Sequence, residues 1–155
     1  MKSQDLRFPI PREAFFAGER NGHKAFWVKK SEDESMNSIY LNLGYVKTYE
    51  EDIRKALFWN DANLFKGDSF DLFLVYYLDD DSIEFYGYPL KENGDAREGT
   101  AGCIIFTPDR HGYDLFRSIM DDETKKLGYE SLMDLYESNE PGYVDKNKDA
   151  ENERA

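Results

Sequence analysis

The sequence predicts an α+β fold: an antiparallel sheet of four to five strands, with one inserted helix and two C-terminal helices. Three observations support this prediction. Several segments alternate apolar and polar residues with the period of two that a half-buried strand requires. A helix-capping pattern interrupts these segments, and the last third of the chain repeats apolar residues at helical spacing.

The first part of the chain contains three segments that we expect to be extended. Residues 8–12, FPIPR, are biased toward extended geometry by their two prolines. Residues 23–30, HKAFWVKK, follow the turn signal RNG and contain β-favouring Phe, Trp and Val. Residues 38–46, SIYLNLGYV, show the alternation of a half-buried strand.

The inserted helix is predicted from residue 48 onward, in TYEEDIRKALFW. Thr48 and Glu51 have the spacing of a capping box, which satisfies two backbone donors at a helix start. Ile53, Ala56 and Leu57 recur at helical spacing, so we expect these three side chains to face the core.

Two strands joined by a tight turn are predicted for residues 70–78 and 82–90, with Asp79, Asp80 and Asp81 between them. Both alternating faces of the first of these strands are apolar, which is typical of a central strand covered on both sides. Residues 103–107, CIIFT, are predicted to be a further short buried strand.

Residues 107–138 are predicted to be mostly helical, with a break at Gly128 that divides them into two helices. Residues 139–155 contain few apolar side chains, and we expect an acidic, partly disordered C-terminal tail. No linker or internal repeat divides the rest, so residues 1–138 are predicted to form a single α+β domain.

The charge is strongly acidic and unevenly distributed. The chain of 155 residues has a net charge of −12, and residues 68–98 hold nine Asp or Glu residues against two Lys or Arg. Such a surface repels nucleic acid and anionic lipid and attracts basic proteins. We therefore expect no direct binding to nucleic acid or to a membrane.

The sequence favours a cytoplasmic location. No stretch approaches eighteen apolar residues, and the first residues lack the layout of a signal peptide. Cys103 is the only cysteine, which excludes an internal disulfide and a cysteine-based zinc cluster. Because Cys103 lies in the apolar run GCIIF, we expect it to be a small buried residue and not a nucleophile.

Catalytic motifs are weak in this sequence. Three adjacent aspartates cannot converge on one ion without an unusual backbone, and the run from Asp79 lacks the glycine and glutamate of a twelve-residue calcium loop. His111 could act as a general base toward Ser118 or Cys103, but no metal-binding histidine pair exists. Residues 93–102 contain glycines without a Lys-Ser or Lys-Thr pair, so no phosphate loop is expected. We expect no cofactor.

Tyrosines and carboxylates are interleaved around the aspartate run. Tyrosine combines apolar area with a hydroxyl group and is enriched at protein interfaces, while carboxylates pair with Lys and Arg. This combination predicts a partner-binding surface. Its candidate residues are Tyr77, Asp79, Asp80, Asp81, Glu84, Tyr86, Tyr88, Glu92 and Asp95.

The leading hypothesis is a small, non-enzymatic binding protein that neutralises a basic partner, namely a nuclease or another nucleic-acid-binding enzyme. An immunity protein, an antitoxin, or a phage inhibitor of a host defence nuclease would fit. The acids of residues 79–98 and 121–137 would imitate nucleic-acid phosphates or pair with catalytic lysines and arginines of the partner. Two alternatives remain open. One is a hydrolase, which would use either a divalent metal bound by Asp79–Asp81 and Glu84 or His111 as a general base. The other is a structural or adaptor module that oligomerises, for example as a homodimer.

Overall fold

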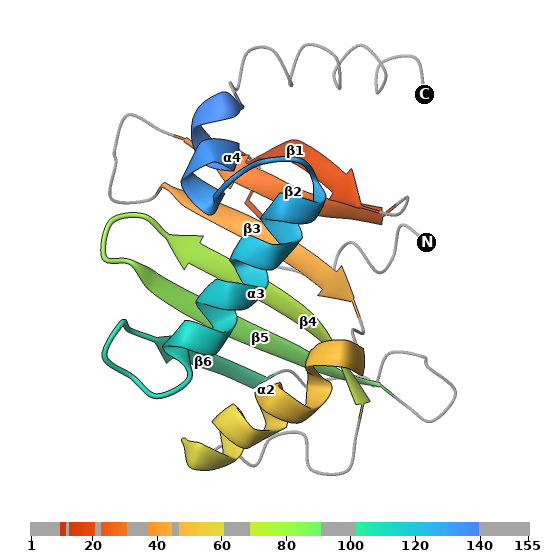
Figure 1. Cartoon of the computed structure of the whole chain (residues 1–155), viewed down its shortest axis with the longest axis vertical. Coiled ribbons are helices and arrows are strands. Elements are labelled where there is room, and N and C mark those ends of the chain that lie inside the picture. The colour runs from red at the N-terminus through yellow and green to blue at the C-terminus, as the bar shows by residue number, and fades with distance from the viewer. Residues whose placement is uncertain are drawn as a thin grey trace.

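The fold is one antiparallel sheet with helices on one of its faces (Figure 1). A computed structural model describes residues 10–11, 13–20, 23–30, 37–44, 47–60, 69–90 and 102–139. Within them, the elements in chain order are β1 (Phe15–Arg20), β2 (His23–Lys29), β3 (Ser38–Gly44), α2 (Lys47–Trp59), β4 (Ser69–Tyr77), β5 (Ser82–Leu90), β6 (Gly102–Phe106), α3 (Tyr113–Lys126) and α4 (Leu132–Ser138).

The strands follow one another across the sheet in the order β1-β2-β3-β4-β5-β6, and every neighbouring pair is antiparallel. α2 lies between β3 and β4 in the chain, yet these strands still pair, with Leu41 opposite Leu74. This confirms the α+β prediction with one inserted and two C-terminal helices. The described sheet has six strands, one more than the upper end of the prediction.

The additional strand is β1, whose sequence FFAGER is apolar only in its first half. Its pairing with β2 shifts register on both sides of Gly18, which marks a β-bulge. A Cβ atom at Gly18 would lie 2.7 Å from Leu127 Cδ1, so the absence of a side chain lets the end of α3 approach the strand. The predicted extended segment 8–12 lies mostly outside the described residues.

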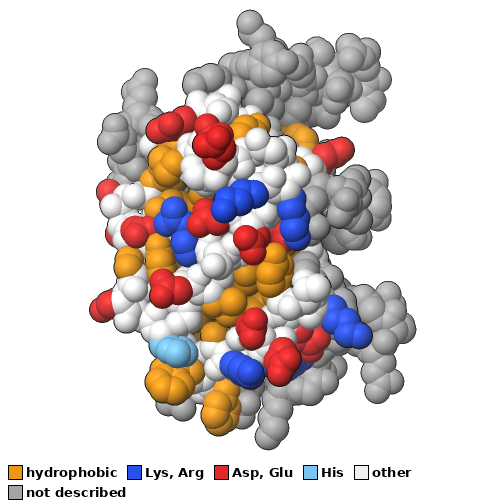
Figure 2. Space-filling view, in the orientation of Figure 1, with side chains coloured by type: hydrophobic (Ala, Val, Ile, Leu, Met, Phe, Trp, Pro, Cys, Tyr) orange, Lys and Arg blue, Asp and Glu red, His pale blue; other side chains and the backbone are white. Residues whose placement is uncertain are grey.

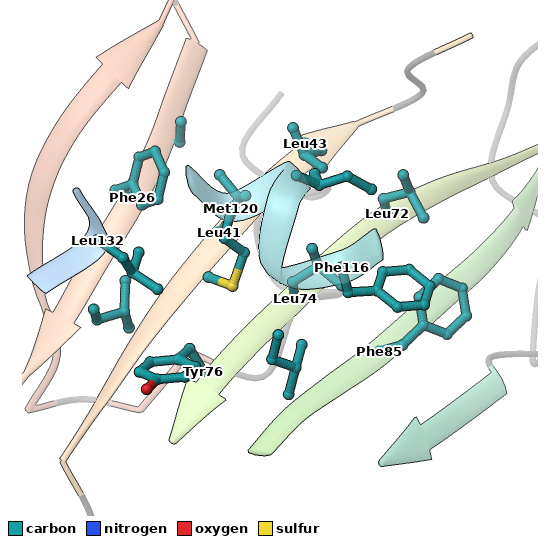
Figure 3. Close-up of a cluster of buried hydrophobic side chains, with 14 of the residues drawn as sticks. Phe26, Leu41, Leu43, Leu72, Leu74, Tyr76, Phe85, Phe116, Met120 and Leu132 are labelled. Atoms are coloured by element: carbon teal, nitrogen blue, oxygen red, sulfur yellow. The ribbon is translucent and has the colours of Figure 1, made fainter. Parts of the chain in front are cut away.

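The helix-covered face of the sheet carries the main core, to which every described strand and helix contributes at least one residue. Figure 3 shows Phe116 and Met120 of α3 directed toward side chains of β3, β4 and β5. Phe116 is fully buried, and its ring centroid lies 5.3 Å from that of Phe85 and 4.8 Å from that of Phe106. The side chains between α3 and the sheet are therefore closely packed and shielded from water.

The opposite face, on which none of the described helices lies (Figure 1) and which we name the helix-free face, carries a second, smaller cluster that is rich in aromatic side chains. Its buried members are Tyr40, Phe73, Val75 and Tyr88, and Ile10, Ala14, Trp27, Tyr77 and Tyr86 pack against them while remaining partly exposed. β4 contributes alternate residues to both faces, which confirms the prediction of a central strand covered on both sides.

β6 differs from the sequence prediction of a buried strand. Phe106 is fully buried, but Ile105 is 48% exposed and Cys103 is exposed. The physical reason is that β6 is the terminal strand of the described sheet, so none of the described strands pairs with its outer edge. The prediction that Cys103 is a buried residue is therefore wrong.

The helices lie close to their predicted positions. α2 begins at Lys47, one residue before the predicted cap Thr48. Its Ile53, Ala56 and Leu57 side chains are buried, as predicted. Gly128 has a φ angle of +106° and lies between α3 and α4, which confirms the predicted break.

The remaining predictions concern the chain end and the membrane. Of the predicted tail, residues 139–155, only Asn139 is among the described residues, so the tail itself stays a prediction. In the part of the chain that the structure describes, no helix is both long enough and apolar enough to cross a membrane.

Candidate binding surface

The structure brings several of the predicted binding residues together on the helix-free face of β4 and β5. Their pairing places Val75 opposite Glu84 and Phe73 opposite Tyr86, and side chains of such pairs share a face. The turn between the two strands adds two aspartates. We name the group Tyr77, Asp79, Asp80, Glu84 and Tyr86 the acidic–tyrosine surface.

Glu84 is the centre of this surface because both of its carboxylate oxygens accept hydrogen bonds. The Tyr77 hydroxyl donates to Oε1 at 2.6 Å. The Cys103 thiol donates to Oε2 at 3.0 Å from the neighbouring strand β6. The carboxylate is thus held in one orientation by β4 and by β6.

Burial together with the Glu84 carboxylate changes the acidity of the surrounding donors. Both effects raise the pKa of Tyr77 and of Tyr86 above the ordinary value of a phenol. The same two causes raise the pKa of the Cys103 thiol to about 12. These groups are therefore neutral donors at neutral pH, and Cys103 lacks the thiolate that a nucleophile needs.

The tyrosine rings of β5 pack against other aromatic rings on the same face of the sheet. The rings of Tyr86 and Tyr88 are stacked, with centroids 6.5 Å apart and planes 7° apart. Tyr86 also meets Phe73 edge-on at 5.9 Å. Tyr88 itself is only 8% exposed, so it supports Tyr86 within the second cluster and does not belong to the accessible surface.

Asp79 and Asp80 are the exposed part of the turn between β4 and β5. Asp80 Oδ1 accepts hydrogen bonds from the Ser82 hydroxyl at 2.7 Å and from the Ser82 backbone at 3.3 Å, which fixes the turn. An open hollow of about 240 Å³ lies beside it. The hollow is lined by Tyr77, Asp79, Asp80, Ser82, Glu84 and Ile105.

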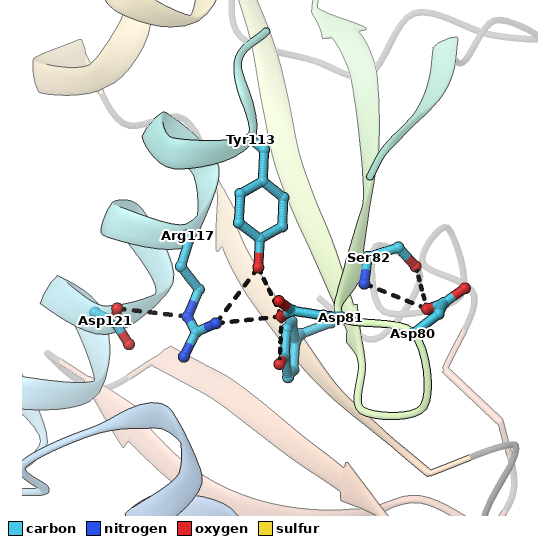
Figure 4. Close-up of polar contacts among 7 residues, drawn as sticks. Asp80, Asp81, Ser82, Tyr113, Arg117 and Asp121 are labelled. Atoms are coloured by element: carbon cyan, nitrogen blue, oxygen red, sulfur yellow. Dashed lines mark hydrogen bonds and ion pairs between the residues drawn. The ribbon is translucent and has the colours of Figure 1, made fainter. Parts of the chain in front are cut away.

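Asp81 points away from this hollow and joins the turn to helix α3 (Figure 4). Its Oδ1 accepts hydrogen bonds from the hydroxyls of Tyr76 and Tyr113, both at 2.6 Å. Arg117 Nη1 lies 3.3 Å from the same oxygen. The third aspartate of the run is therefore a structural contact between the hairpin and the helix layer.

The contacts of Asp81 outweigh the cost of its partial burial. Burial alone would raise the pKa of Asp81, but the hydroxyls of Tyr113 and Tyr76 and the charge of Arg117 hold it below its ordinary value. Asp81 also has a φ angle of +60°, a left-handed conformation that aspartate tolerates better than most residues.

Arg117 connects this cluster to the rest of α3. Its guanidinium carbon lies 5.0 Å from the centre of the Tyr76 ring, and its Nε lies 3.5 Å from Asp121 Oδ2. Sequence reasoning missed Tyr76, Tyr113 and Arg117 as partners of the aspartate run. The spacing of Tyr113 and Arg117 indicates that they share a helix face, but nothing local indicates that the turn reaches that face.

The carboxylates predicted for the metal-dependent alternative do not all meet: Asp79, Asp80 and Glu84 line the hollow, whereas Asp81 does not. Asp81 faces the helix layer, whereas Glu84 faces the helix-free side, so these carboxylates do not converge on one ion. Within the described ranges, no group of three or more His, Cys, Asp or Glu residues could hold a metal. Glu92 and Asp95 lie outside the described residues.

The predicted base His111 is positioned by an aromatic contact. Its ring stacks on Trp59 at a centroid distance of 4.3 Å. Among the described residues, no hydrogen bond joins the His111 ring to Ser118 or to Cys103, and the Cys103 thiol is directed to Glu84. A nucleophile–base pair is therefore not formed by these side chains.

Comparison with known proteins provides no family assignment. No protein-family model, no curated protein and no solved structure matches the chain. What the acidic–tyrosine surface can bind must therefore follow from its own contacts, charge and exposure.

Proposed function

We propose that this chain is a cytoplasmic, non-enzymatic binding protein that neutralises a basic partner, a nuclease or another nucleic-acid-handling enzyme. The observation that carries the proposal is the hollow of the acidic–tyrosine surface, which is bordered by Asp79, Asp80 and Glu84 and by the Tyr77 ring. An immunity protein, an antitoxin and a phage anti-defence inhibitor would all use such a surface in the same way.

The chemistry of the hollow fits a Lys or Arg side chain. Carboxylates accept charge-assisted hydrogen bonds from ammonium and guanidinium groups, and a tyrosine ring offers its face to the same cations. The net charge of −12 would accelerate the approach of a basic protein over a longer distance. In this proposal the carboxylates occupy the positions that nucleic-acid phosphates would take in the partner's groove.

The helix layer is a less suitable place for this interaction. Figure 2 shows acidic and basic side chains mixed across that side of the molecule. Asp121 lies beside Arg117, and Glu123 is fully buried and accepts hydrogen bonds from Tyr49 and Lys126. The negative charges of these two carboxylates are therefore offset by basic side chains of the protein itself, whereas the donors to Glu84, the Tyr77 hydroxyl and the Cys103 thiol, are neutral.

The experiment compares two double variants that remove the same charge from opposite sides of the molecule. Asp79→Asn/Asp80→Asn alters the acidic–tyrosine surface, and Asp122→Asn/Glu130→Gln alters exposed acids of the helix layer. A panel of purified basic nucleases is tested for inhibition by the wild-type chain, and association rates are measured across salt concentration. With an inhibited nuclease, the first variant should lower the association rate about tenfold at low salt, and the second should lower it less.

Two outcomes would contradict the proposal. Equal losses in both variants would show that net charge alone acts and that the hollow is not the site. Inhibition that does not weaken with rising salt would exclude an electrostatic mechanism, because exposed charges are screened beyond about 10 Å at 0.1 M salt.

A further inference from the structure

A pair of large apolar side chains projects from the C-terminal end of α2, away from the acidic–tyrosine surface. Phe58 is 80% exposed and Trp59 is 67% exposed. The Trp59 ring stacks on His111 with an angle of 28° between the ring planes. Figure 2 shows hydrophobic side chains beside a histidine at the lower end of the molecule. We name Phe58, Trp59 and His111 the aromatic ridge.

Hydrogen bonds fix the position of the aromatic ridge. Asn60 Nδ2 donates to the His111 carbonyl at 2.9 Å, which ties the loop after β6 to the end of α2. Arg110 Nε donates to Asn60 Oδ1 at 2.8 Å, and Arg110 Nη1 donates to the Ile105 carbonyl at 2.8 Å. Because Trp59 and His111 are held in place before any partner binds, little ordering of these two side chains would be needed for docking.

Open hollows lie on either side of the ridge. Two open hollows of about 580 and 630 Å³ adjoin it, and Lys55, Trp59 and His111 line both of them. A ridge beside a hollow can insert into the equivalent hollow of a second copy that is related by a two-fold axis. Such isologous contacts are the commonest way in which identical chains associate.

The charge around the ridge points to the same partner. The charged residues that line the two hollows are nearly balanced: Glu51, Asp52, Asp109 and Asp114 against Arg54, Lys55 and Arg110. This local net charge of −1 contrasts with −12 for the whole chain. Two copies therefore repel each other less when they meet here than at the acidic–tyrosine surface, to which a basic protein would be drawn more strongly.

We propose that the aromatic ridge is a homodimer interface, in which Trp59 of each copy enters the hollow beside the ridge of the second copy. An exposed tryptophan held within a polar rim is the usual form of an energetically dominant interface residue. The proposal does not depend on the function proposed above, because the dimer uses an apolar surface of nearly balanced charge and the basic partner an acidic one. Salt should therefore strengthen the dimer and weaken binding of the basic partner.

The test measures the mass of the full chain by sedimentation equilibrium over a wide range of protein concentration. We expect a shift from the monomer mass of 18.1 kDa toward twice that mass. Raising the salt concentration from about 0.05 to 0.5 M should strengthen the dimer, because it screens the repulsion between two acidic chains. Tryptophan emission should shift to shorter wavelength as the dimer forms and Trp59 loses water.

Three variants locate the interface. Trp59→Ala and Phe58→Ala should each weaken dimerisation about tenfold or more. At protein concentrations where the wild-type chain is monomeric, their thermal midpoints should equal that of the wild-type chain, because both side chains are exposed. Ile105→Ala is the matched control, since it truncates the other exposed large apolar side chain of the described residues, and it should leave dimerisation unchanged.

A chain that stays monomeric at all concentrations and both salt levels would overturn the proposal. It would also be overturned if Ile105→Ala, and neither Trp59→Ala nor Phe58→Ala, abolished the dimer, because the contact would then involve the edge strand β6. Neither result would bear on the inhibition of a nuclease, which is measured separately.

Discussion

The two faces of the sheet are built from the same strands but differ in composition and in closure. On β5, Phe85 points to the helix-covered face and is fully buried, and the next residue, Tyr86, points to the helix-free face and is half-buried. The helix-covered face is filled mainly by aliphatic and phenylalanine side chains. The helix-free face is dominated by aromatic residues, several with a polar group at the ring edge.

This difference gives the two faces of one strand different chemistry. Burial on the helix side removes apolar area from water, which is the main stabilising contribution to a fold. The other face keeps hydroxyl and carboxylate groups at the surface, where they remain able to bind. Residues on the two faces should therefore respond differently to substitution.

The largest expected difference is between Phe85→Ala and Tyr86→Ala. Phe85→Ala should lower the free energy of unfolding by about 3–5 kcal/mol, because it leaves a cavity against Phe116. Tyr86→Ala should cost less than about 2 kcal/mol, because its side chain is already partly hydrated. Urea denaturation followed by circular dichroism measures both, and equal losses would show that the helix-free face is as tightly closed as the helix-covered face.

The second prediction concerns the reactivity of Cys103 on the helix-free side. Although Cys103 is an exposed residue, its thiol is partly desolvated where it donates to Glu84, and a pKa of about 12 leaves almost no thiolate at pH 8. Alkylation by iodoacetamide should therefore be about 100-fold or more slower in the folded chain than in urea. Glu84→Gln should accelerate the reaction of the folded chain, because it removes the carboxylate that raises the thiol pKa.

Cys103 is the only cysteine, so mass spectrometry reads its modification directly. Rapid alkylation of the folded wild-type chain, at the rate seen in urea, would show that Glu84 does not hold the thiol in the way described. If Glu84→Gln does not change the alkylation rate of the folded chain, burial alone must raise the pKa of the Cys103 thiol.

The third and smallest effect distinguishes the two sides of the aspartate turn. Asp81→Asn should lower the free energy of unfolding at pH 7 by about 1–2 kcal/mol, because it removes a charged acceptor of hydrogen bonds. Asparagine also tolerates the left-handed backbone, so strain should not contribute. Asp79→Asn is the control and should change stability by less than about 0.5 kcal/mol.

The pH dependence gives this third prediction a second measurement. The pKa of Asp81 is lower in the folded chain than its ordinary value of about 3.9. Asp81 therefore contributes stability above that ordinary value, and the contribution is lost as pH falls through the folded pKa. The wild-type chain and Asp81→Asn should thus converge in stability as the solution is acidified, and a constant difference down to pH 2 would contradict the assignment.

Much of the fold could be predicted because its signals are local. Residues 70–78 are apolar on both faces, which indicates a strand buried on both sides, whereas the alternation in residues 82–90 indicates burial on one side. The polar run between these segments indicates a tight turn. Gly128 indicates a helix break because glycine adopts the left-handed conformation at little cost. The grouping of Tyr77, Glu84 and Tyr86 could also be predicted, since alternate residues on paired strands share a face.

Other features depend on neighbours that are distant in sequence. β1 has a weak pattern of its own and is stabilised by pairing with β2 and by the approach of Leu127 to Gly18. Cys103 lies in an apolar run, but its exposure follows from the position of β6 at the sheet edge. Local sequence contains no information on which strand will be terminal.

The conformation of the aspartate run depends both on local sequence and on contacts with residues distant in sequence. The sequence by itself determined that Asp79, Asp80 and Asp81 form a turn between two strands, because three adjacent carboxylates favour a solvated connection over a sheet interior. Only the tertiary structure decided that Asp81 turns toward the hydroxyls of Tyr76 and Tyr113 while Asp79 and Asp80 stay in water. The physical reason is that α3 packs against only one of the two faces of the hairpin. Asp81 lies on that face and contacts α3, whereas Asp79 and Asp80 do not.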